Sequence, residues 1–514
     1  MTPPIGHVAL VGAGPGDPGL MTVRARELLE RAEVVLYDAL VPDTILSLAP
    51  ERAVRIDVGR RAGDRLAGSR LAGGHTTEQE ERNRLLLEYA RAGKRVVRLK
   101  GGDPFTFGRG GEEALSLAGA GIPFEVVPGV TSGIAAPACA GIPVTHRGVS
   151  SSVLFVTAHG QDGKPWGGEG RERLCGAGTI VCYMMGGAPA ALARELVRAG
   201  RDVSEPAAIV SNGSLPTQRT EVTTLGALAE GNSPDLPAPR LLVVGGTVAL
   251  RGEIAWFERR ALFGRTILVT RAEDQAPALV EPLRALGANV IPCPCIRIGE
   301  AQDPDALDSA LRRKWDWIVL TSPNGVASLA RTLARLRADA RVLAGARIAA
   351  VGPATVSDLL GLGVRADFEP SEATSRCLAE ELPGAASLRG KNLLLWQADA
   401  AGPELADRLR ATGADVARVN AYRTQRADAF PSGAAGALRD LAVDAVTFTS
   451  GSSVRHFQAL VPDDLRPAAS ALPAFCIGPT TASAARATGF GTIHTAAPHT
   501  VSGLTDLIQR VFHK

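Results

Sequence analysis

The chain has 514 residues, which is room for roughly three or four domains of ordinary size. It is 45% hydrophobic and 21% charged with a formal net charge of +3, which excludes a disordered chain and gives no sign of a nucleic-acid partner. No apolar run approaches the ~18 residues of a membrane span, no secretory signal opens the chain, and the scattered cysteines support neither a disulfide framework nor a zinc site, so we expect a cytoplasmic α/β protein.

Strand-like and helix-like segments alternate in the first half. HVALVG (7–12), EVVLYDALV (33–41) and KRVVRLKGGDP (94–104) predict strands, and TVRARELLERA (22–32) and TTEQEERNRLLLEYARAG (76–93) predict helices, the second with Thr77 and Glu80 in capping-box spacing. Such alternation is typical of a parallel sheet with crossover helices. Residues 58–77 are expected to form a surface loop, and a lobe boundary is expected near Gly160.

The second half contains an internal repeat. RTILVTRAEDQAPALVEPLRALGANV (265–290) resembles NLLLWQADAAGPELADRLRATGADV (392–416), and Pro277 and Pro403 are as far apart as Gly287 and Gly413. WDWIVLTSPNGVASL (315–329) resembles VDAVTFTSGSSVRHF (443–457), and RIAAVGPATVSDLLGLG (347–363) resembles AFCIGPTTASAARATGF (474–490). The repeat predicts two similar α/β units, with a ligand in the cleft between them.

Three glycine-rich turns follow predicted strands in the first half. They are VGAGPGDPGLMT (11–22), LKGGDPFTFGRGGEE (99–113) and VVPGVTSGIAAPACAGIPVTHRG (126–148). The first lacks the third glycine of a dinucleotide fingerprint, because Asp17 stands in its place. An NAD-dependent oxidoreductase is therefore excluded.

These turns, together with VVLYDALV, TIVCYMM and AAIVSNGSLPTQR, carry a resemblance over residues 5–258. The first half resembles the uroporphyrinogen-III C-methyltransferases, which are members of the tetrapyrrole methylase family. The resemblance implies a two-lobed α/β enzyme that forms a homodimer and binds S-adenosyl-L-methionine between its lobes. It also implies double methylation of uroporphyrinogen III to precorrin-2.

The same resemblance implies site residues. Asp38 matches the proposed proton acceptor, and Arg60 stands where relatives carry a lysine proposed as proton donor. Because arginine is effectively always protonated, we expect Arg60 to bind a substrate carboxylate instead. The cofactor contacts are expected at Pro15, Gly101, Gly102, Asp103, Thr106, Thr131, Ser132, Met184 and Gly213.

The second half resembles the uroporphyrinogen-III synthases through ILVTRAE, VLTSPNGV, AAVGPAT, AYRT, FTSGSSVRHF and FCIGPTTASAA. The resemblance implies cyclisation of hydroxymethylbilane without a cofactor. The expected domains are 1–262 and 263–514, the second with one lobe from 263–298 plus 423–514 and an inserted lobe from 299–422. Tyr422 is the expected proton donor, and substrate carboxylates are expected at Arg271, Ser322, Ser450, Thr480 and Thr481. For each hydroxyl, a plain helix N-cap is the alternative.

Two questions stay open at this stage. The first half could methylate a later precorrin, with the second half a non-catalytic tetrapyrrole-binding module. The product could enter the sirohaem or the cobalamin branch, and a precorrin-2 dehydrogenase or chelatase is expected on a separate chain.

Overall fold

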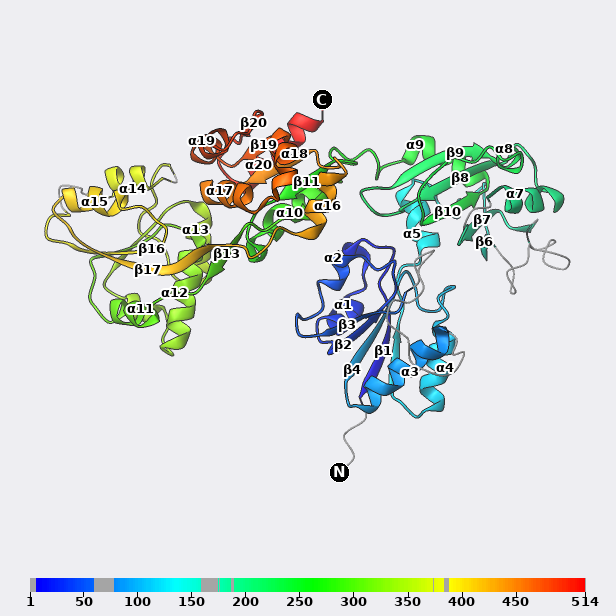
Figure 1. The fold of residues 1–514 in the computed structure, drawn as a ribbon, viewed down its shortest axis with the longest axis horizontal. Helices are drawn as coiled ribbons and strands as arrows, with labels where there is room; N and C mark the ends of the chain where they lie inside the picture. Colours follow the sequence, from blue (N-terminus) through cyan, green and yellow to red (C-terminus); the bar gives the residue numbers. More distant parts are fainter. Residues whose placement is uncertain are drawn as a thin grey trace. The chain divides into compact units, whose positions relative to one another are not determined.

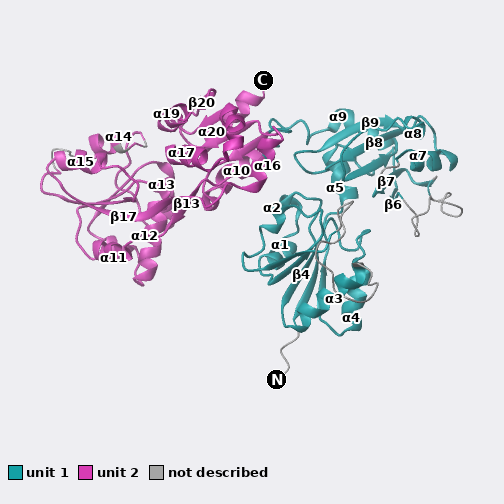
Figure 2. Ribbon diagram, in the orientation of Figure 1, with its two compact units in different colours: residues 1–265, 285–289 teal, residues 266–284, 290–514 magenta. Residues whose placement is uncertain are grey.

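The structure is a computed structural model, and it describes residues 6–59, 78–158, 174, 176–185, 189–372, 374–382 and 388–513. The chain divides into two compact units (Figure 2): residues 1–265 with 285–289, and residues 266–284 with 290–514. Each unit holds two five-stranded sheets. Among the described residues, no helix is both long and apolar enough to cross a membrane.

The first lobe of the first unit is built on a parallel sheet in the order β3-β2-β4-β1-β5. Ala9 and Val11 of β1 pack with α1 and α2, whereas Val8 and Leu10 pack with α3 and α4 on the other face (Figure 1). The strands are β1 (His7–Gly12), β2 (Val34–Tyr37), β3 (Val54–Asp57), β4 (Arg95–Lys100) and β5 (Phe124–Val127). The helices are α1 (Val23–Leu29), α2 (Asp43–Leu46), α3 (Glu78–Arg91) and α4 (Gly110–Gly119). The predicted alternation is confirmed here.

The second lobe has a mixed sheet in the order β6-β7-β10-β8-β9. β6 and β7 are parallel, but β10 is antiparallel to β7 and β8, and β8 to β9. Its strands are β6 (Val153–Thr157), β7 (Thr179–Tyr183), β8 (Pro206–Ser211), β9 (Arg219–Thr224) and β10 (Arg240–Val244), and its helices are α5 (Ser132–Cys139), α7 (Pro189–Arg198), α8 (Leu225–Ala229) and α9 (Arg251–Ile254). The prediction of a parallel sheet is wrong for this lobe, because the connection from β8 to β9 is too short for a crossover helix.

The two lobes also meet earlier than the boundary expected near Gly160. Ala136 and Ala140, of α5 and its C-terminal end, share a core with Val181 and Val243 of the second sheet. The second lobe therefore begins by Ser132, because this apolar helix buries its side chains there. Residues 60–77, including Thr77, and most of 160–178 lie outside the described residues.

The second unit confirms the internal duplication. Its sheets have the orders β12-β11-β18-β19-β20 and β13-β17-β16-β14-β15. The repeat matches β11 with β16, β18 with β14 and β19 with β15, and each trio forms adjacent parallel strands in the same order. The first sheet contains β11 (Thr266–Val269), β12 (Asn289–Pro292), β18 (Ala445–Phe448), β19 (Ala474–Cys476) and β20 (Ile493–Thr495); the second contains β13 (Ile296–Gly299), β14 (Trp317–Leu320), β15 (Arg347–Ala350), β16 (Asn392–Ala398) and β17 (Asp415–Arg426).

Helices accompany both sheets of this unit (Figure 1). Since β13 pairs with β17, the inserted sheet extends past 299–422 at both ends. With the first sheet are α10 (Pro277–Ala285), α16 (Ser432–Arg439), α17 (Gly451–Leu460), α18 (Arg466–Ala471), α19 (Pro479–Ala487) and α20 (Val501–Phe512). With the second are α11 (Pro304–Leu311), α12 (Pro323–Arg335), α13 (Pro353–Gly361), α14 (Ser375–Glu381) and α15 (Glu404–Ala411).

Candidate active site

Hydrogen bonds tie the three glycine-rich turns of the first unit together. Gly14 and Gly102 exchange two backbone N–H to O bonds of 3.1 and 2.7 Å. The Asp103 carboxylate accepts a hydrogen bond from the Gly129 N–H at 3.1 Å. A Cβ on Gly129 would lie 2.2 Å from the Gly102 carbonyl oxygen, so this approach requires glycine. The turns after β1, β4 and β5, which are neighbours in the sheet, therefore form one rigid surface.

These turns line a cavity of about 530 Å³, to which both lobes of the unit contribute. Asp38 lines it, whereas Arg60 lies outside the described residues. Every residue predicted to contact the cofactor also lines it: Pro15, Gly101, Gly102, Asp103, Thr106, Thr131, Ser132, Met184 and Gly213.

Several residues around the cavity adopt a left-handed backbone conformation. Phe107, Met184 and Asn212 have φ of 53°, 55° and 49°, and Gly102 has 69°. For residues other than glycine such conformations cost about 1–3 kcal/mol each, and they cluster at functional sites. Their presence in both walls of one cavity supports a functional role for it.

The Asp103 carboxylate stabilises the loop in which Asp103 lies. Its Oδ1 accepts hydrogen bonds from the Phe105 N–H at 2.9 Å and the Thr106 hydroxyl at 3.1 Å, in addition to the bond that Oδ2 accepts from Gly129. Gly213 is likewise required by packing, since a Cβ there would lie 2.2 Å from the Cβ of Ala136. Both positions therefore shape the cavity whether or not they touch a ligand.

Tyr183, at the end of β7, completes the wall, and the sequence analysis did not single it out. Its hydroxyl accepts a hydrogen bond from the Gly133 N–H at 2.9 Å and lies 2.8 Å from Thr131 Oγ1. Its ring packs on Phe107 with centroids 4.9 Å apart. Burial raises the pKa of Tyr183, so the phenol stays protonated at neutral pH. The TIVCYMM motif contains this tyrosine but shows no link to the distant Thr131.

A row of buried charges lies behind Asp38. Arg98 Nη2 donates to Asp38 Oδ1, Arg98 Nε donates to Glu113 Oε1 at 2.9 Å, and Lys100 Nζ lies 3.0 Å from Glu113 Oε2. The side chains of Arg98, Lys100 and Glu113 are 1%, 3% and 0% exposed, against 30% for Asp38.

Burial and neighbouring charges act on the two cations differently. Burial has the largest influence on the pKa of Lys100 and lowers it, and the charge of Arg98 lowers it further. The charge of Glu113 offsets only part of this decrease. For Arg98, burial is again the largest influence and lowers the pKa, but Asp38 and Glu113 together outweigh it and raise the pKa overall. Arg98 therefore keeps its charge in a buried position.

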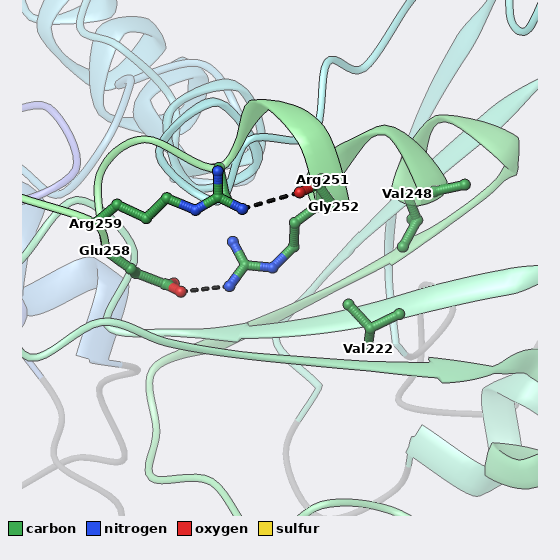
Figure 3. Close-up of a pocket in the computed structure, with 8 residues that line it drawn as sticks. Val222, Val248, Arg251, Gly252, Glu258 and Arg259 are labelled. Carbon is green, nitrogen blue, oxygen red and sulfur yellow. Dashed lines mark hydrogen bonds and ion pairs between the residues drawn. The ribbon is translucent and has the colours of Figure 1, made fainter.

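A second pocket, of about 540 Å³, lies in the second lobe (Figure 3). Its charged groups pair with the protein itself: Arg251 donates to Glu258, and Arg259 donates to the Gly252 carbonyl oxygen at 2.9 Å. None of the described residues that the sequence predicts for a site lines this pocket.

In the second unit, four predicted residues follow three adjacent parallel strands. Arg271 follows β11, Ser450 follows β18, and Thr480 and Thr481 follow β19. Ser450 caps α17, since its Oγ accepts a hydrogen bond from the Ser453 N–H at 3.1 Å. Thr480 is exposed and Thr481 is buried. The carboxyl ends of parallel strands share one edge, which brings these residues to the same edge of the sheet.

Arg271 differs from the three hydroxyl residues. Its Nε and Nη1 are buried and have no hydrogen-bond partner within the described part of the chain. Burial lowers the pKa of Arg271, and Asp274 offsets this in part. Arginine nevertheless stays charged, and an uncompensated buried charge is costly, so the site favours an anion beside it.

Ser322 and Tyr422 meet in the inserted lobe. Ser322 Oγ lies 2.8 Å from the Tyr422 hydroxyl and accepts the Gly325 N–H at 3.2 Å as the N-cap of α12. Burial raises the pKa of Tyr422, so its phenol stays protonated. Gln275, in the other lobe of the second unit, donates a hydrogen bond to Asn324 of α12. This link between the two lobes of the unit was not predicted from the sequence.

Two family models match the chain. The model of the tetrapyrrole (corrin/porphyrin) methylases matches residues 7–229, and the model of uroporphyrinogen-III synthase HemD matches residues 277–506.

Similar proteins agree with this division. The porphyrin biosynthesis protein HemD of Ruminiclostridium josui is 40% identical over 486 residues, 94% of this chain and 93% of that protein. Siroheme synthase 1 of Serratia proteamaculans is 48% identical over 255 residues, so this chain spans about half the length of that relative, 50%. A solved uroporphyrin-III C-methyl transferase from Thermus thermophilus, complexed with S-adenyl homocysteine, is 42% identical with a TM-score of 0.41, and the match covers 48% of this chain and 100% of that one.

The expected fold class, enzyme class and cofactor are therefore confirmed. Tetrapyrrole methylases use S-adenosylmethionine, and the bare glycine backbone of the cavity in the matching half fits such a ligand. The near full-length relative covers the regions that both family models match. This chain belongs to the family of bifunctional porphyrin-biosynthesis enzymes that carry a tetrapyrrole methyltransferase followed by a uroporphyrinogen-III synthase of the HemD type.

Proposed function

We propose that this chain catalyses two consecutive reactions of tetrapyrrole biosynthesis. The second half cyclises hydroxymethylbilane, with inversion of its last ring, to uroporphyrinogen III. The first half methylates two adjacent rings of that product to give precorrin-2. The observation that carries this proposal is the cavity of the first unit, where all predicted cofactor residues and Asp38 meet in a chain whose other half matches the synthases.

The cofactor residues would hold S-adenosylmethionine mainly through backbone. Gly101 and Gly102 expose backbone groups to the cavity, and Pro15 lies on the turn bonded to them. Met184, a residue that is 60% exposed, offers a soft apolar contact from the opposite lobe. The cofactor supplies the methyl group when bound.

Asp38 would accept the proton that a pyrrole carbon loses after methylation. Its carboxylate lines the cavity, and Oδ1 is held by Arg98. Asp38→Asn should lower kcat roughly 100-fold, because it removes a general base and keeps the shape. The affinity for S-adenosylhomocysteine, measured by calorimetry, should stay unchanged. Arg60 would bind a substrate acetate or propionate.

In the synthase half, binding of the substrate carboxylates would make the largest contribution to catalysis. Hydroxymethylbilane carries many carboxylates, and Arg271 presents two buried guanidinium nitrogens, Nε and Nη1, that have no hydrogen-bond partner among the described residues. Ser450, Thr480 and Thr481 would add hydroxyl and N–H donors along the same sheet edge. Tyr422, with Ser322, would donate a proton to the departing hydroxyl.

The organisation of the whole protein is part of the proposal. We place the domain boundary between residues 262 and 263 and take the synthase lobes as 263–298 plus 423–514 and 299–422, with β13 and the end of β17 extending the inserted sheet beyond these bounds. The active species would be a cytoplasmic homodimer formed through the methyltransferase half, and the six described cysteines, all free thiols, suit a reducing compartment. A separate dehydrogenase or chelatase would take precorrin-2 into sirohaem or cobalamin.

One experiment tests both reactions. The purified chain receives hydroxymethylbilane and S-adenosylmethionine, and the products are separated and identified by mass and isomer type. We expect precorrin-2 without added synthase. If only the type-I porphyrinogen forms while supplied uroporphyrinogen III is methylated, the second half is a binding module. If supplied uroporphyrinogen III is not methylated but a later precorrin is, the first half acts further along.

A further inference from the structure

The buried charged side chains of Arg98, Lys100 and Glu113 lie behind the cavity and act on Asp38. We propose that Arg98, oriented by Glu113, is a positioning residue that holds the Asp38 carboxylate ready to accept a proton, and that Lys100 balances the charge of Glu113. The inference rests on the proposed methylation. It assigns a role to three residues that do not themselves line the described cavity.

The guanidinium of Arg98 is fixed in position and direction. Nε donates to Glu113, and Nη1 donates to the carbonyl oxygens of Leu36 and Leu99 at 3.4 and 3.2 Å. Nη2 is left for Asp38, to which it donates. Because all three nitrogens are used and the fork is planar, the direction of the Asp38 contact is set by β2, β4 and α4.

A purely structural ion pair would not need Asp38. The pair of Arg98 and Glu113 already joins β4 to α4, and a buried pair adds little stability over apolar side chains of the same volume. The row continues, however, to a carboxylate that is 30% exposed and lines the cavity. Within the described residues, Asp38 Oδ1 has Arg98 as its side-chain partner, whereas Oδ2 has none. One oxygen is therefore held and the other is available to substrate.

Lys100 keeps the row neutral. Arg98 and Lys100 occupy alternate positions of β4, so they share the sheet face that α4 covers. With two cations and two carboxylates, the charge of Glu113 is matched by Lys100, and the charge of Arg98 remains available to Asp38. A buried Asp38–Arg98–Glu113 row without the lysine would carry an unbalanced negative charge.

A double-mutant cycle tests the coupling. Arg98→Met keeps an unbranched apolar stem at this position and leaves Glu113 paired with Lys100, so folding should survive. We expect kcat for supplied uroporphyrinogen III to fall about as far as in Asp38→Asn, roughly 100-fold, while the S-adenosylhomocysteine affinity changes less than about threefold. The double variant should be no slower than Asp38→Asn alone. Arg98→Lys should restore kcat only in part, because an ammonium cannot reproduce the fork.

Arg201 provides a matched control. It pairs with Glu205 in the second lobe, its side chain is 6% exposed, and it does not line the described cavity. Arg201→Met should cost thermal stability like Arg98→Met and leave kcat unchanged. If the double variant loses activity by the product of the single losses, or if Arg201→Met lowers kcat equally, the positioning role is wrong. A wild-type chain that fails to methylate uroporphyrinogen III overturns the proposed function, and the inference falls with it.

Discussion

Backbone groups shape the candidate site of the first unit, whereas side chains dominate that of the second. In the first unit, Gly14 and Gly102 bond to each other through main-chain atoms, and the turns line a cavity. In the second unit, Ser322 and Ser450 already cap helices, and Arg271 keeps two nitrogens without a described partner. A site built from glycine backbone is rigid before its ligand binds. A site built from helix-capping hydroxyls and one arginine gains its missing hydrogen-bond partners only when the ligand binds.

The largest effect is expected where the backbone makes the site. Gly102→Val should lower the affinity for S-adenosylhomocysteine more than about 100-fold, because φ of 69° strains a β-branched residue and the side chain would project beside Thr131. Synthase activity should be unchanged. Gly121→Val is the matched control, since φ is 67° there and nothing lies within 4 Å of the added Cβ. Equal affinities for wild type and Gly102→Val, by calorimetry, would place the cofactor elsewhere.

The cation of the second unit should give the next largest effect. Arg271→Met should lower kcat/KM of the synthase roughly 100-fold, the loss of a charged hydrogen bond worth up to about 3 kcal/mol in a buried site. The same change removes a partly buried charge whose burial Asp274 offsets only in part, so the thermal midpoint should rise. An assay of the type-III porphyrinogen isomer measures kcat/KM of the synthase, and a thermal melting curve measures the midpoint. Lower stability with normal turnover would make Arg271 a structural residue.

Arg60 gives a smaller effect in the first half. Arg60→Ala should raise KM for uroporphyrinogen III roughly tenfold, because one charge-assisted hydrogen bond is lost, and Arg60→Lys should largely restore it. Steady-state kinetics at varied substrate measure this. A fall in kcat without a change in KM would instead indicate proton transfer, and no change in either constant would remove Arg60 from the site.

The smallest effect is expected at Tyr422. Tyr422→Phe should lower the kcat of the synthase about fivefold, the equivalent of one neutral hydrogen bond of about 1 kcal/mol, because the Ser322 hydroxyl remains beside it. The raised pKa keeps the phenol protonated below pH 10, so the wild-type rate should not show a tyrosine titration between pH 6 and 9. A loss beyond about 100-fold would make the phenol the sole proton donor and Ser322 only a cap.

Local patterns determined much of the fold and of the first site. The alternation of residues 7–104 predicts β1, α1, β2, α3 and β4 of the first lobe, and the matched spacing of Pro277 with Pro403 and Gly287 with Gly413 predicts two similar α/β units. Glycine turns are visible in sequence for the same reason: backbone conformation is encoded locally, by the residues that adopt it.

The tertiary structure alone decided which distant residues meet. Arg98 and Lys100 alternate in an apolar strand, a signal that they share one face, but their partners Asp38 and Glu113 lie on other elements. Two other contacts, of Tyr183 with Thr131 and of Gln275 with Asn324, also join residues that are distant in sequence. The antiparallel strands of the second lobe and the early lobe boundary likewise became visible only in the tertiary structure. Such pairings depend on strand order and on how helices pack across a sheet. Periodicity records which side of an element is buried and not what it is buried against.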